Sequence, residues 1–182
     1  MKESATVKVA DLTFKPLIPA ETIAARIHEL GQQIAKDYAG KTPVLLGVLK
    51  GSTMFLSDLS RAIDTDCTLS FMKVSSYHGG TSSTGEIKRD MTLNEDLKDR
   101  HILIIEDIVD TGNTAVFLFN ELQKSKPASV KMATLLFKPA AMKHDFKPDY
   151  VAFEIGNEFV VGYGLDYNEL GRNLPHIYVL SK

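Results

Sequence analysis

Cysteine is almost missing from this sequence, and its scarcity excludes two kinds of structure. Among 182 residues the only cysteine is Cys67. A single thiol can form neither an intrachain disulfide nor a cysteine cluster that binds zinc. We therefore expect a protein of a reducing compartment, the cytoplasm. A chain of this length can bury a core large enough to fold as one domain, residues 1–182.

Long apolar runs and an excess of basic charge are lacking too. No window approaches the roughly 20 apolar residues of a membrane helix, and the N-terminus has no apolar run of the signal-peptide type. The 21 Lys and Arg residues stand against 23 Asp and Glu residues, which gives a net charge of -2. We expect neither a membrane nor a nucleic acid as the partner.

Strand-like and helix-like patterns alternate along the chain, which predicts an α/β fold with a mostly parallel central sheet flanked by helices. Residues 20–38 carry apolar side chains at spacings of three and four and predict an amphipathic helix. Further helices are expected after residues 53 and 114. Strands are predicted at 44–49, 67–76, 101–105, 130–137 and 150–155.

Two segments fall outside this alternation. Residues 77–90 are rich in Gly, Ser and Thr and poor in apolar side chains, which predicts a mobile loop. The terminal segments are expected to add a small cap over the sheet, with residues from about 156 to 182 contributing to it.

The most informative stretch is residues 104–114, with the sequence IIEDIVDTGNT. A buried-looking strand leads through Glu106 and Asp107 into a turn rich in Thr and Gly, at the expected start of a helix. Backbone N–H groups at a helix N-terminus, with threonine hydroxyls and a glycine that permits close approach, form a cradle for phosphate. The spacing of a P-loop is absent, which argues against a nucleotide triphosphatase.

The acids of this stretch indicate what carries the phosphate. Carboxylates repel a phosphate unless a cation or a polyhydroxylated sugar lies between them, and Mg²⁺ with oxygen ligands is the usual cation. Glu106 and Asp107 therefore predict a sugar phosphate with Mg²⁺. The alternative is that these acids only complement the dipole of the following helix.

Residues 104–114 closely resemble the signature of the type I phosphoribosyltransferases, which bind phosphoribosyl diphosphate and displace its diphosphate with a nitrogen nucleophile. Three other segments resemble the hypoxanthine-guanine branch of that family: residues 49–52 its diphosphate loop, 76–77 with 83–85 its flexible catalytic loop, and 159–167 its purine-binding segment. The resemblance covers nearly the whole chain. It implies a Mg²⁺-dependent, homo-oligomeric purine salvage enzyme that forms IMP or GMP.

The resemblance also implies roles for single residues. Asp110 would be the general base at N7 of the purine. The donor and its phosphates would contact Lys50, Gly51, Glu106, Asp107, Asp110, Thr111, Gly112, Asn113, Thr114 and Arg172. The purine would contact Lys138, Phe159, Val160 and Asp166. Mg²⁺ would be held by Glu106, Asp107 and Asp166, and Ser76 and Tyr77 would belong to the flexible loop. Residues 156–182 would contribute the purine-binding part of the cap.

One residue departs from the pattern of several relatives, including the mammalian branch. They carry lysine where this chain has Asn113, which makes the bacterial enzymes the closer comparison. Asn113 supplies no charge, but the backbone and the threonine hydroxyls can still bind phosphate. We expect the departure to affect affinity for the donor and not the type of reaction.

Two other functions stay open at this point. A regulatory protein could keep the phosphoribosyl diphosphate site as a sensor, although the chain has an acid at Asp110 and no appended DNA-binding domain. A transferase for another base, such as adenine, xanthine or a pyrimidine, is the second alternative.

Overall fold

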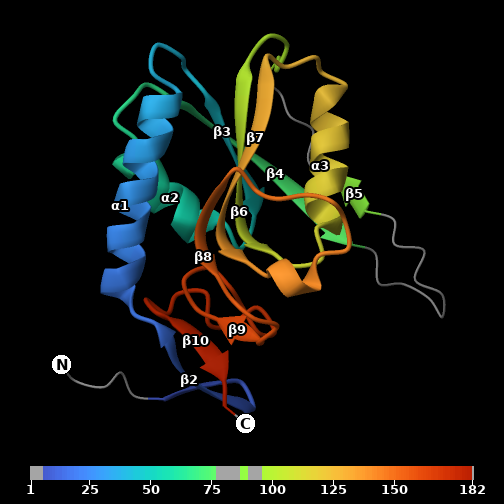
Figure 1. Ribbon diagram of the computed structural model, residues 1–182. Helices are drawn as coiled ribbons and strands as arrows, with labels where there is room; N and C mark the ends of the chain where they lie inside the picture. The colour runs from blue at the N-terminus through green and yellow to red at the C-terminus, as the bar shows by residue number, and fades with distance from the viewer. Residues whose placement is uncertain (1–5, 77–86, 90–95, 182) are drawn as a thin grey trace.

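A six-stranded sheet forms the centre of the molecule (Figure 1). The computed structural model describes residues 6–76, 87–89 and 96–181. The strands lie in the order β5-β4-β3-β6-β7-β8, and all neighbours are parallel except β5, which is antiparallel to β4. Their bounds are β3 Val44–Leu49, β4 Thr68–Ser76, β5 Ile87–Arg89, β6 His101–Val109, β7 Ser129–Phe137 and β8 Tyr150–Glu154. The predicted α/β fold with a mostly parallel sheet is confirmed.

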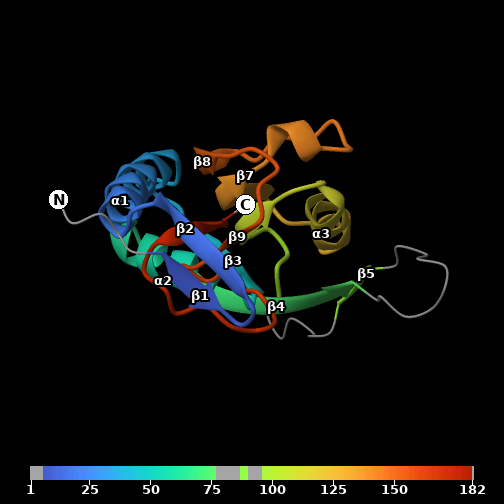
Figure 2. The ribbon, with the colours of Figure 1, turned by 90° about the horizontal axis from the view of Figure 1, so that it is seen from below.

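Helices cover both faces of this sheet. α1 (Ala20–Asp37) and α2 (Thr53–Ala62) lie on one face, and α3 (Asn113–Gln123) lies on the other (Figures 1 and 2). A short 3-10 helix, η1 (Pro139–Ala141), follows β7. The apolar positions of α1 point inward, as their spacing predicts: Ile23, Ile27, Leu30 and Ile34 are buried.

Burial on both faces explains why the central strands are apolar without interruption. In β6, Leu103 and Ile105 pack into the core beside α1 and α2, whereas Ile102 and Ile104 pack into the core beside α3. Side chains of a strand alternate between the two faces of a sheet, so each face needs its own apolar set.

A second, antiparallel sheet lies at the carboxyl ends of the parallel strands, at the bottom of Figure 1, and we call it the hood. Its strands are β1 (Val7–Val9), β2 (Leu12–Ile18), β10 (Ile177–Leu180) and β9 (Val160–Val161), in that order. The expected cap from the terminal segments is thus present. Its N-terminal half, residues 7–18, was not predicted as strand.

Two boundaries differ from the prediction. β6 continues to Val109, so Glu106 and Asp107 lie inside the strand and not after it; ladder pairs such as Ile108 with Leu136 hold this extension. Residues 87–89 were expected in a mobile loop, but they form β5 because the chain returns along β4, with Arg89 opposite Val74. The rest of the predicted loop lies outside the described residues.

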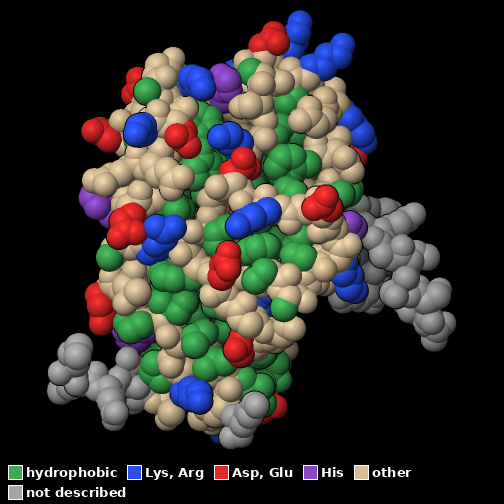
Figure 3. Space-filling view, in the orientation of Figure 1, with side chains coloured by type: hydrophobic (Ala, Val, Ile, Leu, Met, Phe, Trp, Pro, Cys, Tyr) green, Lys and Arg blue, Asp and Glu red, His purple; other side chains and the backbone are tan. Residues whose placement is uncertain are grey.

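Charged side chains of both signs are interspersed on the face shown in Figure 3. This mixture agrees with the near-balance of acidic and basic residues in the sequence. Within the described ranges, no helix has the length and apolar character needed to cross a membrane. A few large apolar side chains are exposed, among them Leu69 and Phe71 of β4 and Met54 of α2.

Candidate active site

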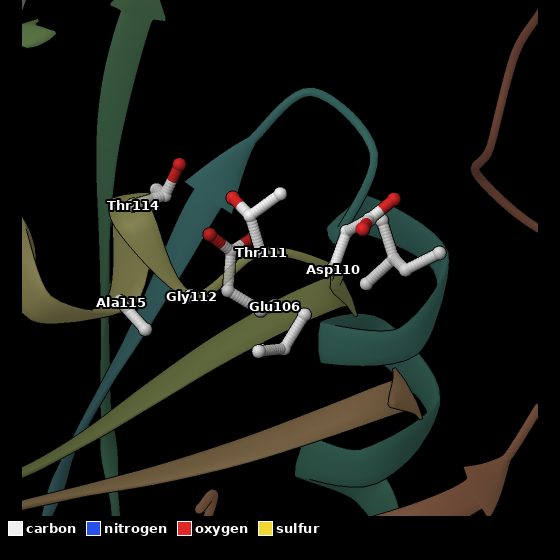
Figure 4. A pocket seen from close by; sticks show the side chains of 8 residues that line it. Glu106, Asp110, Thr111, Gly112, Thr114 and Ala115 are labelled. Atoms are coloured by element: carbon white, nitrogen blue, oxygen red, sulfur yellow. The ribbon is translucent and has the colours of Figure 1, made fainter. Parts of the chain in front are cut away.

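The turn between β6 and α3 encloses a small cavity of about 90 Å³ (Figure 4). Gly112 precedes the first residue of α3 with φ of 80°, a left-handed conformation that glycine adopts at little cost. The lining of this cavity consists of Glu106, Ile108, Val109, Asp110, Thr111, Gly112, Thr114 and Ala115. A cavity at a helix N-terminus, bordered by threonines, is suited to a phosphate group.

Two carboxylates lie in β6 beside this turn. Glu106 is buried, and Asp107 is half-buried, with its Oδ1 accepting a hydrogen bond of 2.8 Å from the N–H of Ile108. Burial raises the pKa of Glu106 well above its usual range, and the charge of Asp107 raises it further. Burial also raises the pKa of Asp107 to about 6, although its own hydrogen bonds and the charge of Arg172 oppose the rise. Burial thus disfavours the charged forms of both acids, a cost that a bound cation would offset.

The loop after β3 lies directly against Asp107. A Cβ atom built on Gly51 would be 1.5 Å from Oδ2 of Asp107, so only glycine permits this approach. The adjacent Lys50 forms an ion pair of 2.8 Å with Glu169 of the segment between β9 and β10. The predicted diphosphate loop therefore lies beside the predicted metal-binding acids.

Arg172 and Asp166 form an ion pair of 2.7 Å in the same segment. Nη1 of Arg172 also donates to the carbonyl oxygen of Gly164 at 2.9 Å. Among the described residues, no hydrogen-bond partner reaches the buried Nε of Arg172. Arg172, predicted to contact the diphosphate, and Asp166, predicted to hold Mg²⁺, thus lie together. Glu169 lies beside them and contacts Arg172 at 3.5 Å.

A second cavity, of about 250 Å³, is lined by residues at the ends of β6 and β7 and by residues in and around β9 of the hood. Lys138, at the end of β7, is buried and its Nζ lies 3.1 Å from Oδ2 of Asp110. Phe159, just before β9, is exposed on one side and contacts Phe14 of β2 with ring centroids 6.1 Å apart. The lining consists of Asp107, Ile108, Asp110, Lys138, Phe159, Val160, Leu165 and Asp166.

The structure brings most of the predicted site residues together. Asp110 borders both cavities, and all four residues predicted at the purine line the second one. Tyr77 lies outside the described residues, as does the side chain of Ser76. Sequence reasoning missed Glu169, whose ion pair with Lys50 joins residues 119 positions apart in the chain. It also missed Phe14, which only strand pairing in the hood places behind Phe159.

The family model of the phosphoribosyl transferase domain matches residues 18–168. The chain belongs to this family. It is 49% identical over 168 residues to the hypoxanthine-guanine phosphoribosyltransferase of Streptococcus pneumoniae, with 92% of this chain and 93% of the relative covered. The Lactococcus lactis enzyme of the same name is also 49% identical, with 92% and 91% covered.

Solved structures of the family share the fold. The hypoxanthine phosphoribosyltransferase of Staphylococcus aureus superposes with a TM-score of 0.87 at 49% identity, covering 92% of this chain and 91% of its own. The Trypanosoma cruzi hypoxanthine phosphoribosyl transferase gives a TM-score of 0.88 at 38% identity, covering 96% and 95%. The type I phosphoribosyltransferase fold expected from the sequence is confirmed.

Glu106 and Asp107, near the turn at residues 110–114, fit a Mg²⁺ ion that substrate oxygens help to bind. Within the described part of the chain, no three His, Cys, Asp or Glu side chains are grouped closely enough to hold an ion unaided. Mg²⁺ is commonly bound through one or two carboxylates together with substrate phosphates. The adjacent cavity at the start of α3 and the raised pKa of Asp107 agree with that mode.

We expect Asp107→Asn to stabilise the metal-free protein and to weaken donor binding. The pKa of Asp107 is about 6 in the folded protein, above its ordinary value of 3.8, so ionisation favours the unfolded chain. The resulting loss in the free energy of unfolding develops as the pH rises from 3.8 to about 6 and is complete above about pH 6. The asparagine variant should gain roughly 1–3 kcal/mol in the free energy of unfolding at pH 8, and less at pH 4.

Thermal unfolding in EDTA at both pH values measures this gain. Asp64→Asn, which changes an exposed aspartate after α2, is the control and should shift the unfolding temperature little at either pH. If Asp107→Asn is no more stable than the unchanged protein at pH 8, the carboxylate of Asp107 is not a source of electrostatic strain.

Proposed function

We propose that this protein transfers the 5-phosphoribosyl group from 5-phosphoribosyl 1-diphosphate to hypoxanthine or guanine, in a Mg²⁺-dependent reaction that releases diphosphate. The relatives named hypoxanthine-guanine or hypoxanthine phosphoribosyltransferase each match 92% of the chain. The observation that supports the proposal best is the pair formed by Asp110 and Lys138, 3.1 Å apart on the wall of the second cavity. Asp110 also borders the phosphate cavity, so one residue faces both proposed substrates.

The donor would bind along the carboxyl ends of β3 and β6. Its 5-phosphate would occupy the turn at residues 110–114, where the backbone N–H groups at the start of α3 meet it. Glu106 and Asp107 would face the ribose hydroxyls. The diphosphate would lie between Lys50 with Gly51 on one side and Arg172 on the other. Gly51 lies against Asp107, Arg172 pairs with Asp166, and both Lys50 and Arg172 contact Glu169.

The purine would enter the cavity beneath the hood. Segment 156–182 would supply its purine-binding part, with Phe159 stacking on the ring and Val160 contacting its edge. A 6-oxopurine presents N7 and O6 side by side on one edge. Asp110 accepts a proton and Lys138 donates one, so the pair is complementary to an N7–H group beside an O6 acceptor.

The reaction forms a bond between a purine nitrogen and the anomeric carbon, while the bond from that carbon to the diphosphate oxygen breaks. Asp110 accepts or shares the proton that the purine loses. Lys50 and Arg172 would hold the departing oxygens. Glu106, Asp107 and Asp166 would hold Mg²⁺, which when bound supplies neutralising charge for the diphosphate.

An assay of diphosphate release tests this function directly. We expect diphosphate and IMP to form when the protein is mixed with the donor, Mg²⁺ and hypoxanthine, and GMP with guanine. EDTA should abolish the reaction, and excess Mg²⁺ should restore it. A protein that binds the donor but releases no diphosphate with either base is a sensor and not a transferase.

We also propose that the protein is a cytoplasmic homo-oligomer. Leu69 and Phe71 expose apolar surface on β4, and Met54 does so at the start of α2. Leu69 and Phe71 lie two residues apart and so share one face of β4, and contiguous exposed apolar patches commonly mark contacts between protein chains. A solution mass equal to a single chain of 20.1 kDa would exclude the oligomer.

A further inference from the structure

The segment after β7 packs against the turn at residues 110–114, which we call the phosphate turn. The N–H of Lys143 donates to the carbonyl oxygen of Thr111 at 3.0 Å, which joins the two backbones. Met142 lies against Gly112, since a Cβ atom built there would be 2.6 Å from the methionine Cε. These contacts fix the segment beside the turn, and they bring the side chain of His144 to the first residue of α3.

His144 contacts Asn113, the first residue of α3. Nε2 of His144 lies 2.6 Å from Oδ1 of Asn113. An amide oxygen can only accept, so Nε2 carries the proton and donates it. The bond fixes the orientation of the Asn113 amide and leaves its NH₂ group available to another acceptor. The residues on either side of Asn113, Gly112 and Thr114, both line the phosphate cavity.

We propose that His144 is a positioning residue of the 5-phosphate site, acting through Asn113. This inference rests on the proposed function, because it takes the cavity at residues 110–114 as the site of the 5-phosphate. The hydrogen bond holds the turn in the conformation that receives the phosphate.

The physical reason lies in the cost of ordering the turn. Gly112 loses more conformational freedom on ordering than any other residue type would, and Asn113 has no charge with which to attract the phosphate. A turn held in place before the ligand arrives binds it more tightly, because less ordering is needed on binding. His144 should therefore matter for ligands that carry the 5-phosphate, and little for the chemical step.

The test compares two replacements of His144. His144→Phe keeps a ring but removes the donor, and we expect it to weaken the binding of IMP about 3- to 10-fold and to raise the KM for the donor similarly. The kcat should change less than about twofold, since the bond is not made to the reacting atoms. His144→Gln keeps an N–H donor and should recover part of the loss.

A matched control is His28→Phe on α1. His28 also contacts a side-chain amide, that of Gln32 at 3.0 Å, but it lies far from the turn in the chain and on another element. This variant should bind IMP like the unchanged protein. Calorimetric titration with IMP gives the affinities, and thermal unfolding shows whether each variant is folded.

A double-mutant cycle with Asn113→Ala decides whether His144 acts through Asn113. In the Asn113→Ala protein, His144→Phe should cause no further loss of affinity for IMP. An undiminished loss in that background, or tight binding of IMP by His144→Phe alone, would overturn the positioning role while leaving the transferase function intact. Failure of the unchanged protein to bind IMP would instead overturn the proposed function.

Discussion

Asp110→Asn should lower kcat about 10²–10⁴-fold and change the affinity for the donor much less. Asparagine has nearly the same size and can still accept a hydrogen bond from Lys138, which lies 3.1 Å from the Asp110 carboxylate. It cannot take the proton that the purine nitrogen loses. Single-turnover measurements with hypoxanthine separate the chemical step from product release and therefore report on this proton transfer directly.

The control is Asp66→Asn, which replaces an exposed aspartate in the loop before β4 and should leave kcat unchanged. Wild-type turnover of Asp110→Asn at its pH optimum would show that Asp110 is not the base. A loss confined to donor affinity would assign Asp110 to binding, a role that its place on the phosphate cavity also permits.

The site was predictable from the sequence where its residues are neighbours along the chain. The chemistry of residues 104–114 can be inferred from the segment alone, because a buried strand, paired acids and a helix N-terminus follow one another without interruption. The long extension of β6 was not predictable in this way. Acidic residues are rare inside buried strands, and only the ladder to β7 keeps Glu106 in the sheet.

Contacts between distant parts of the chain could not be predicted from periodicity. Phe14 lies in a short N-terminal strand whose partner, β10, is more than 150 residues away, and pairing with it creates the hood. The bond from His144 to Asn113 likewise depends on the path of the chain after β7. The sequence shows His144 as one of several isolated histidines, so nothing local distinguishes it from a surface residue.

Lys138 is the residue on which discrimination between purines should depend. It is buried, with 8% of its surface exposed, and its ammonium group can only donate hydrogen bonds. Hypoxanthine and guanine offer O6 as an acceptor at this position, whereas adenine offers an NH₂ group, which would place two donors face to face. A mismatch of this kind between buried groups costs about 1–3 kcal/mol.

We therefore expect Lys138→Ala to reduce kcat/KM for hypoxanthine at least about 10-fold, and to change any weak reaction with adenine much less. Lys138→Met, which keeps the apolar stem and removes only the donor, should show the same selectivity and so exclude a simple loss of packing. Lys131→Ala is the control, because Lys131 lies on the same strand with its ammonium group over the ring of Tyr150. It should change kcat/KM for neither base.

Both Lys138 variants leave Asp110 without its partner, which should slow the reactions of both bases alike. The ratio of the two kcat/KM values, in which that common effect cancels, is thus the quantity to measure. An unchanged ratio, or efficient use of adenine by the unmodified protein, would remove the O6 contact and with it the preference for 6-oxopurines.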